Sequence, residues 1–348
     1  MANPVYRIID ANFNRAREAL RVIEDFCRFY LSSAPLTTCA KQLRHELSAA
    51  VSKLDSAQLI AARDSLSDVG AGKTVDNQLQ RGNLKDCFMA GCKRLTESLR
   101  TLAEMTQTLN PEVAQTIEKL RFSAYTLEKD IVLFADAAEK FKPVRLYVII
   151  SNTLPAEVLS LTRQCLAGGA DCIQLRVKIV DDDKLFALAL EFAKICKDAG
   201  VLSIINDRVD IAVAAGADGV HLGQNDIPIE QARKLQLVPL IIGKSTHSLK
   251  QLHVACEEMP TYVSLGPIFS TGTKPEAKPV GLDYVKQATE ILAGTGIGHV
   301  AIGGITLDNV GDVLKTGAKT IAVCSAVTGA ADPTAACRAL KEKINVFK

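Results

Sequence analysis

The chain has 348 residues, a hydrophobic content of 48% and a formal net charge of +2. A nearly balanced charge without a long run of one sign argues against a nucleic-acid partner or an anionic membrane surface. The length exceeds that of an average single domain, so we expect two domains.

No apolar run is long enough to span a bilayer, and the opening residues Met-Ala-Asn-Pro-Val-Tyr lack the apolar core of a signal peptide. The ten cysteines include no C-x-x-C pair, and most lie inside apolar patterns. Buried, reduced thiols therefore fit better than a disulfide framework or a zinc site. We expect a cytoplasmic protein, and the sequence leaves its oligomeric state open, with a homo-oligomer as one option.

The first part of the chain has helical periodicity throughout, because apolar residues recur at steps of three and four. Four helices are expected, over residues 13–30, 36–53, 84–108 and 111–138. Residues 63–82 are polar and form a loop in this interpretation. The run Phe141-Lys142-Pro143 ends the helical region, so residues 1–140 are predicted to be an all-α domain.

A charged motif occurs twice in this helical domain. Arg15-x-x-Glu18-x-x-Arg21 is repeated as Arg94-x-x-Glu97-x-x-Arg100, and steps of three place the charges on one stripe of a helix. Such a stripe either lines a polar cavity or forms a solvated face with local ion pairs, and both interpretations stay open. The candidate site residues of the domain are Asn14, Arg15, Glu18, Arg21, Arg63, Asp64, Arg94, Glu97 and Arg100.

The rest of the chain alternates short apolar runs with segments long enough for one helix and two loops. The runs are Leu146–Ile150, Cys172–Val177, Ser203–Asn206, Gly219–Gly223, Ile241–Ser245, Tyr262–Phe269, His299–Gly304 and Thr320–Ser325. Eight such units are typical of a (β/α)₈ barrel, so the fold class is α/β, with an all-α domain in front of a barrel over residues 145–348. Barrels of this kind carry their chemistry at the C-terminal ends of the strands.

The second run ends in Gln174, Arg176 and Lys178, which alternate with the apolar residues Leu175 and Val177. Alternation sends the polar set toward the barrel axis and its mouth, and the apolar pair toward the helices. Buried cations are costly without partners, so an anionic ligand is expected there. Internal salt bridges are the alternative.

Two carboxylates follow neighbouring strands. Asp207 closes the third run, and Asp226 lies just beyond the fourth. Hard oxygen ligands beside cations suit Mg²⁺ that bridges the protein and a diphosphate. Either aspartate alone could instead be a turn residue or a helix cap.

Two further loops extend this site. Ser245 ends the fifth run beside Thr246 and His247, whose hydroxyls and imidazole could orient a polar substrate. Capping of the next helix is the alternative, with Thr246 and Ser248 as the candidates. The loop of residues 270–279 carries hydroxyls and a lysine, and it fits a lid over phosphate; its candidate residues are Thr271, Thr273 and Lys274.

The seventh and eighth strands end in Gly303-Gly304-Ile305 and Val323-Cys324-Ser325. Glycine lets backbone N–H groups approach a phosphate, and the loops after these two strands are the common phosphate site of the fold. The site therefore binds two anionic groups at separate places. No Ser-His-Asp or Cys-His arrangement suggests covalent catalysis, so the pattern favours transfer of an alkyl group from a diphosphate to a phosphate-bearing acceptor.

Residues 145–345 resemble thiamine-phosphate synthase, also called thiamine-phosphate pyrophosphorylase. The matching pieces are Q-L-R-V-K, I-N-D-R-V-D-I-A, G-A-D-G-V-H-L-G-Q-N-D, G-K-S-T-H, G-P-I-F-S-T-G-T-K and A-I-G-G-I, in the family's order. The resemblance implies joining of hydroxymethylpyrimidine diphosphate to thiazole phosphate, with release of diphosphate. It also implies a dissociative reaction, through a pyrimidine-methyl cation trapped by the thiazole nitrogen.

The resemblance implies roles for individual residues as well. It places Asp207 and Asp226 on Mg²⁺. The residues it places on the pyrimidine diphosphate are Gln174, Arg176, Lys178, Asn206, Ser245 and Lys274, of which Arg176, Lys178 and Lys274 are the catalytic candidates. Those it places on the thiazole phosphate are Thr271, Thr273, Gly304, Val323 and Ser325.

The sequence departs from the family pattern at Val177, where glutamate is usual, and Cys324 stands beside the usual serine of strand eight. Alternation points Val177 away from the site, so we expect no loss of activity there. The rival interpretation is a barrel that only binds thiazole or thiamine phosphate, or a tautomerase-like barrel. The presence of Arg176, Lys178 and both aspartates favours the synthase.

The helical half resembles the domain fused to some bacterial synthases, through A-N-F-N-R-A-R-E-A-L-R-V-I-E-D and R-D-S-L-S-D-V-G. That resemblance implies a hydroxymethylpyrimidine-phosphate kinase. No Walker-type loop is present, so a nucleotide site would be unconventional. A scaffold or dimerisation module without chemistry is the alternative.

Overall fold

The computed structural model describes residues 4–73, 76, 80–151, 154–178, 181–236, 238–272, 276 and 278–347. Its internal contacts divide the chain into two compact units, Met1–Val132 and Leu133–Lys348, and the division falls within one long helix. Across these described ranges, no helix is both long and apolar enough to cross a membrane.

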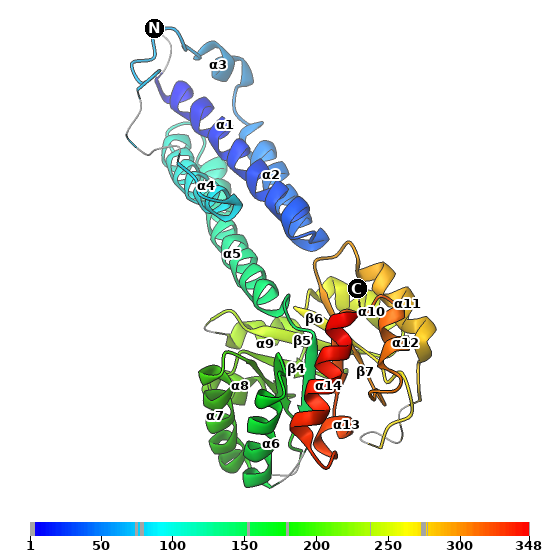
Figure 1. The fold of residues 1–348 in the computed structure, drawn as a ribbon. Coiled ribbons are helices and arrows are strands. Elements are labelled where there is room, and N and C mark those ends of the chain that lie inside the picture. The colour runs from blue at the N-terminus through cyan, green and yellow to red at the C-terminus, as the bar shows by residue number, and fades with distance from the viewer. Residues whose placement is uncertain are drawn as a thin grey trace. The chain divides into compact units, whose positions relative to one another are not determined.

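The first unit is helical, as expected. Its elements are α1 (Pro4–Asp25), the π-helical turn η1 (Phe26–Tyr30), α2 (Ala34–Val51), α3 (Ser56–Ala61), α4 (Leu84–Thr106) and α5 (Pro111–Phe141), which continues into the second unit (Figure 1). The short helix α3 was not predicted. It begins after Asp55, whose carboxylate accepts hydrogen bonds from the backbone N–H groups of Ala57 and Gln58.

The core of this unit lies between α1, α2 and α4. Ala16, Leu20 and Ile23 recur along α1 at steps of three and four and are fully buried. Leu95 and Leu99 on α4 are buried in the same way. The helical period read in the sequence is therefore the period of the packed face.

Eight parallel strands close a barrel in chain order, which confirms the predicted (β/α)₈ architecture. They are β1 (Leu146–Ile150), β2 (Cys172–Leu175), β3 (Leu202–Asn206), β4 (Gly219–Leu222), β5 (Ile241–Thr246), β6 (Tyr262–Leu265), β7 (Gly298–Ile302) and β8 (Ile321–Val323). Several strands end before the predicted boundary, because the polar and glycine residues at their ends leave the hydrogen-bond ladder and line a cavity instead.

Helices surround the barrel (Figure 1). They are α6 (Pro155–Ala167), α7 (Asp182–Asp198), α8 (Val209–Ala214), α9 (Ile229–Leu235), α10 (Leu249–Glu258), α11 (Gly281–Leu292), α12 (Val310–Lys315), α13 (Ser325–Thr328) and α14 (Pro333–Val346).

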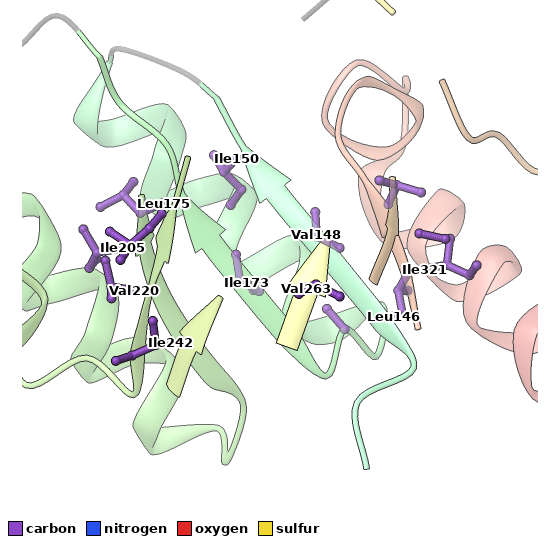
Figure 2. Packing of buried hydrophobic residues seen from close by; sticks show 14 of the residues in the cluster. Leu146, Val148, Ile150, Ile173, Leu175, Ile205, Val220, Ile242, Val263 and Ile321 are labelled. Atoms are coloured by element: carbon purple, nitrogen blue, oxygen red, sulfur yellow. The ribbon is translucent and has the colours of Figure 1, made fainter. Parts of the chain in front are cut away.

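Alternation along each strand sorts the side chains into two apolar clusters. Leu146, Val148 and Ile150 of β1 belong to the cluster shared with the helices, together with the residues labelled on other strands in Figure 2. Tyr147 and Ile149 point the other way and belong to the cluster inside the barrel. This two-residue period fixes which side chains face the barrel axis.

The interior cluster is closed at the N-terminal ends of the strands by the end of α5. Phe141 stacks on Tyr262 with ring centroids 4.3 Å apart and an interplanar angle of 6°. Ala137 and Val144 belong to the same buried cluster. The barrel interior is therefore filled at the N-terminal ends of the strands, and the barrel opens at their C-terminal ends.

Candidate active site

A cavity of about 150 Å³ lies inside the barrel, toward the C-terminal ends of the strands. The predicted site residues that line it are Gln174, Arg176, Lys178, Asn206, Asp207, Ser245, Thr271, Gly304, Val323 and Ser325. Thr273 and Lys274 lie outside the described residues. Residues far apart in the chain are thus brought to one cavity by the barrel.

The end of β2 carries the cationic side of the cavity. Gln174 is buried, and Arg176 donates from Nη1 to Oγ of Ser151 over 3.1 Å. Lys178 is about half exposed. Val177 packs against the cluster beneath the helices, which agrees with the alternation predicted for this segment.

Asp207 lines the cavity and is hydrogen-bonded to Asp226, which is not among the lining residues. Burial raises the pKa of Asp207, and a hydrogen bond between the two carboxyl groups raises it further, against the opposing charge of Lys178. Asp207 has a φ of +63°, a strained value for a residue other than glycine. Oδ2 of Asp226 accepts the backbone N–H of Gly223 over 2.6 Å. The backbone holds the two acids together despite their repulsion.

This pair fits a hard divalent cation such as Mg²⁺. Two carboxyl groups held close enough to share a proton would both ionise around a cation. In the described part of the chain, no three His, Cys, Asp or Glu side chains gather as a metal site. Mg²⁺ commonly takes one or two carboxylates and completes its shell with water and substrate phosphate. The donor set therefore suits a metal that arrives with a diphosphate.

The opposite side of the cavity is built from glycine backbone. Gly303 and Gly304 have φ values of +106° and +64°. A Cβ atom on Gly304 would lie 2.6 Å from the carbonyl oxygen of Ser270, so a side chain cannot be added without displacing that loop. Ser325 begins α13, and Cys324 before it also lines the cavity. This side offers backbone groups and a hydroxyl rather than charge.

Sequence reasoning missed several polar side chains deeper in the cavity. Tyr147, His221 and Tyr262 line it and form hydrogen bonds with one another or with predicted residues. His247, which was already a candidate from the sequence, lines the cavity too and contacts the carbonyl oxygen of Gly266 through Nδ1. Of the two predicted cap candidates, Thr246 and Ser248, Ser248 caps α10, because its side chain accepts the N–H of Gln251. Alternation applied to β1, β4 and β6 would have found Tyr147, His221 and Tyr262.

Most candidates of the helical unit lie on its surface, whereas Asn14 is half-buried and donates to the carbonyl oxygen of Asp10. All six members of the repeated charged motif, Arg15, Glu18, Arg21, Arg94, Glu97 and Arg100, are exposed. Arg21 pairs with Glu24, and Arg100 pairs with Glu104. These positions match the solvated-face interpretation of the stripes more closely than a lined cavity.

Arg63 differs from that set. It donates from Nε and Nη2 to the two carboxylate oxygens of Asp10, both over 2.8 Å, and Asp10 is nearly buried. Arg7, which lies on α1 with Asp10, donates to the carbonyl oxygen of Asp64. The start of the predicted loop is thus tied to α1 by a bidentate ion pair.

Cations, paired carboxylates and a glycine loop at the C-terminal ends of eight parallel strands define a (β/α)₈-barrel enzyme. Residues 146–327 match the family model described as thiamine monophosphate synthase, and residues 7–130 match the ThiD2 family. The chain belongs to the thiamine-phosphate synthase family, and it is a transferase of thiamine biosynthesis.

Similar proteins match nearly the whole chain. A thiamine-phosphate synthase of Nostoc punctiforme is 37% identical over 345 residues, which are 99% of this chain and 95% of that protein. One of Thermosynechococcus vestitus is 37% identical, with 97% and 95% coverage. Among solved structures, thiamine phosphate pyrophosphorylase of Pyrococcus furiosus is 36% identical, with a TM-score of 0.53, and covers 58% of this chain and 96% of its own.

Proposed function

We propose that the barrel joins 4-amino-5-hydroxymethyl-2-methylpyrimidine diphosphate to 4-methyl-5-(2-phosphoethyl)thiazole, with release of diphosphate and formation of thiamine phosphate. The observation that carries this proposal is the arrangement of one cavity with cations and paired carboxylates on one side and a glycine loop on the other. One side suits a metal-bound diphosphate, and the other suits a monophosphate.

In this reaction the bond between the pyrimidine methylene carbon and the diphosphate oxygen breaks, and a bond from that carbon to the thiazole nitrogen forms. Arg176 and Lys178 lie where they can neutralise the charge that grows on the departing diphosphate. Lys274 has the same proposed role. Mg²⁺ held by Asp207 and Asp226 would supply further charge neutralisation on that leaving group.

The remaining contacts position the two substrates. Gln174, Asn206 and Ser245 line the cavity where the pyrimidine would lie. The thiazole phosphate is assigned to the glycine-loop side, where its candidate residues Thr271, Gly304, Val323 and Ser325 line the cavity. Thr273, outside the described residues, remains a candidate from the sequence. Because the cavity measures about 150 Å³ and is lined in part by apolar residues, it would hold the thiazole nitrogen near the reacting carbon and exclude water.

The direct test is incubation of the purified chain with both phosphorylated substrates and Mg²⁺, followed by quantification of thiamine phosphate and diphosphate. We expect Mg²⁺-dependent product from the natural chain and a loss of at least about a hundredfold in Asp207→Ala. Tight binding of thiazole phosphate without turnover, equal in both proteins, would contradict the proposal and favour a non-catalytic barrel.

We further propose that residues 1–140 act as a pyrimidine-phosphate kinase and residues 145–348 as the synthase. The match of residues 7–130 to the ThiD2 family supports a distinct activity in the first domain. In that step the γ-phosphoryl group of ATP would pass to the phosphate of hydroxymethylpyrimidine phosphate, giving ADP and the diphosphate. The ion pair of Asp10 and Arg63 marks the candidate site.

This second activity can be tested in the full chain with the synthase step disabled. In Asp207→Ala, hydroxymethylpyrimidine phosphate and ATP should give ADP and an equal amount of accumulating pyrimidine diphosphate. The additional change Arg63→Gln should abolish this product. If neither protein consumes ATP, the domain is a scaffold.

A further inference from the structure

Five side chains form a continuous hydrogen-bond chain across the barrel interior. Nε2 of Gln174 donates to the hydroxyl of Tyr147 over 2.8 Å, and that hydroxyl lies 3.0 Å from the hydroxyl of Tyr262. The Tyr262 hydroxyl lies 2.9 Å from Nδ1 of His221, whose Nε2 lies 2.9 Å from Oγ of Ser245. We name these five residues the barrel relay.

Packing holds the barrel relay in one geometry. Tyr147 and Tyr262 are 2% and 1% exposed, and Phe141 stacks on the Tyr262 ring. Gly243 leaves the room that the relay needs, because a Cβ atom there would lie 2.2 Å from Cζ of Tyr262 and 2.6 Å from Nδ1 of His221. The rings cannot turn aside without disturbing the barrel core.

The hydrogen bonds of the barrel relay run in one direction. The amide nitrogen of Gln174 only donates, so the single proton of Tyr147 is free to be donated to Tyr262. Burial raises the pKa of both tyrosines well above its usual range, so both hydroxyls stay protonated. In this direction Tyr262 donates to Nδ1 of His221, and Nε2 of the same ring donates to Oγ of Ser245.

The two ends of the barrel relay consequently differ in polarity. Ser245 accepts the Nε2–H of His221, so its own hydroxyl proton is directed elsewhere, and Ser245 lines the cavity. Gln174, whose amide nitrogen is engaged, has its carbonyl oxygen Oε1 left for a ligand. The barrel relay therefore presents one hydrogen-bond acceptor, Oε1 of Gln174, and one donor, the hydroxyl of Ser245, to the cavity in fixed positions.

We propose that the barrel relay is the device that selects an aminopyrimidine over an oxopyrimidine, with Tyr147, Tyr262 and His221 as positioning residues. This inference rests on the proposed pyrimidine substrate. An aminopyrimidine edge carries an amino donor beside a ring-nitrogen acceptor. The 4-oxo analogue carries an acceptor and a ring N–H donor in the exchanged places, so it opposes whichever end of the relay it contacts.

The selectivity is strong because the relay can reverse only as a whole. Turning the Gln174 amide would leave Tyr147 facing an acceptor, and every later bond, including the tautomer of His221, would have to reverse as well. Binding the oxo analogue without that reversal would leave buried polar groups unpaired. We therefore expect at least about a hundredfold preference for the amino substrate.

The decisive variant is Tyr262→Phe, which removes one hydroxyl of the relay and keeps the ring that stacks on Phe141. The preference for amino over oxo pyrimidine diphosphate, measured as the ratio of kcat/KM values and as the ratio of Kd values by calorimetry, should fall about tenfold or more. The KM for thiazole phosphate should not change. Tyr147→Phe interrupts another link and should lower the same ratio.

Tyr284→Phe is the matched control. It also removes a buried tyrosine hydroxyl, which donates to Oγ1 of Thr246 over 2.7 Å outside the relay, and it should leave the ratio unchanged. An unaltered ratio in both relay variants, or an equal loss in the control, would overturn the proposal.

A measurement without turnover separates this inference from the proposed reaction. Nitrogen-15 NMR of the substrate-free full chain, assigned with His221→Gln among the five histidines, should show His221 protonated on Nε2 and not on Nδ1. A proton on Nδ1 would overturn the relay even if the enzyme is active. Absence of thiamine phosphate with the expected tautomer and Kd ratio would instead count against the reaction alone.

Discussion

The Nζ atom of Lys178 lies 3.7 Å from Oδ2 of Asp207, across the mouth of the barrel cavity. This ion pair is long, and the lysine side chain is 53% exposed, so the pair contributes little to stability. A cation and a carboxylate at this spacing suit a diphosphate and its metal bound between them.

The first prediction concerns that lysine. Lys178→Gln should reduce kcat/KM for the pyrimidine diphosphate by about 10²–10³-fold, because a preorganised charge on the leaving group is lost. Thermal stability should hardly change. Steady-state kinetics with both substrates varied, together with a thermal melt, would check this.

The control for this change is Lys184→Gln, which removes a lysine paired with Asp181 on the outside of the barrel unit. It should leave kcat/KM within about twofold of the natural value. Comparable losses in both variants would mean that net charge, and not the place of Lys178, governs the rate.

The second prediction concerns the acids. Because the pKa of Asp207 is raised in the folded protein, the ionised pair destabilises the metal-free fold above that pKa, and this cost disappears as the pH falls below it. Asp207→Asn should therefore raise the Tm measured in EDTA by about 2–4 °C. It should also abolish the rise in Tm that Mg²⁺ with inorganic diphosphate gives the natural chain.

Asp182→Asn provides the comparison, since Asp182 pairs with Arg208 on the protein surface. Its Tm in EDTA should be unchanged or lower, and the Mg²⁺–diphosphate shift should persist. A lower Tm in Asp207→Asn would show that the acid stabilises the fold and that the metal interpretation is wrong.

The third prediction concerns the glycine loop. Gly304→Ala introduces a Cβ atom 2.6 Å from the carbonyl oxygen of Ser270 at a φ of +64°, so the loop must move. We expect the KM for thiazole phosphate to rise about tenfold or more, equivalent to the 1–3 kcal/mol typical of such strain, while the Kd for pyrimidine diphosphate stays constant.

Gly216 allows backbone strain to be separated from contact. Its φ of +66° is nearly the same, but a Cβ atom there would meet nothing within 4 Å. Gly216→Ala should cost about 1 kcal/mol of stability without any change in KM. If both variants raise the KM for thiazole phosphate alike, the effect comes from general destabilisation.

The outline of the fold could be predicted because the helical periodicity and the alternation along the strands both indicate it. Leu146, Val148 and Ile150 face the helices as their alternation requires, and the same rule placed Gln174 and Arg176 at the cavity. The α3 helix escaped prediction because its six residues carry no periodic signal, and only the cap at Asp55 marks its start.

The interior of the site was harder to predict than its rim. His221 and Tyr262 lie in strands that look apolar, and their polar role depends on neighbours up to 115 residues away, as for Tyr147 and Tyr262. The proton pairing of Asp207 with Asp226 likewise depends on how two loops close, which local spacing does not fix. Alternation gives the direction of a side chain, but only the closed barrel gives its partner.

The fourth prediction concerns His299 at the start of β7. Burial, with the nearby charge of Lys319, lowers its pKa from 6.5 to about 4, and its Nε2 accepts the backbone N–H of Lys319 over 3.0 Å. Below about pH 6.5 the unfolded chain binds a proton at this histidine, whereas the folded chain does so only near pH 4. The free energy of unfolding should therefore fall as the pH drops from 6.5 to 4, by at most about 3 kcal/mol. His299→Gln keeps an acceptor but does not titrate, and urea unfolding between these pH values should show a flatter dependence. His253→Gln, at an exposed position on α10, should retain the natural slope, and an unchanged slope in His299→Gln would place the acid sensitivity elsewhere.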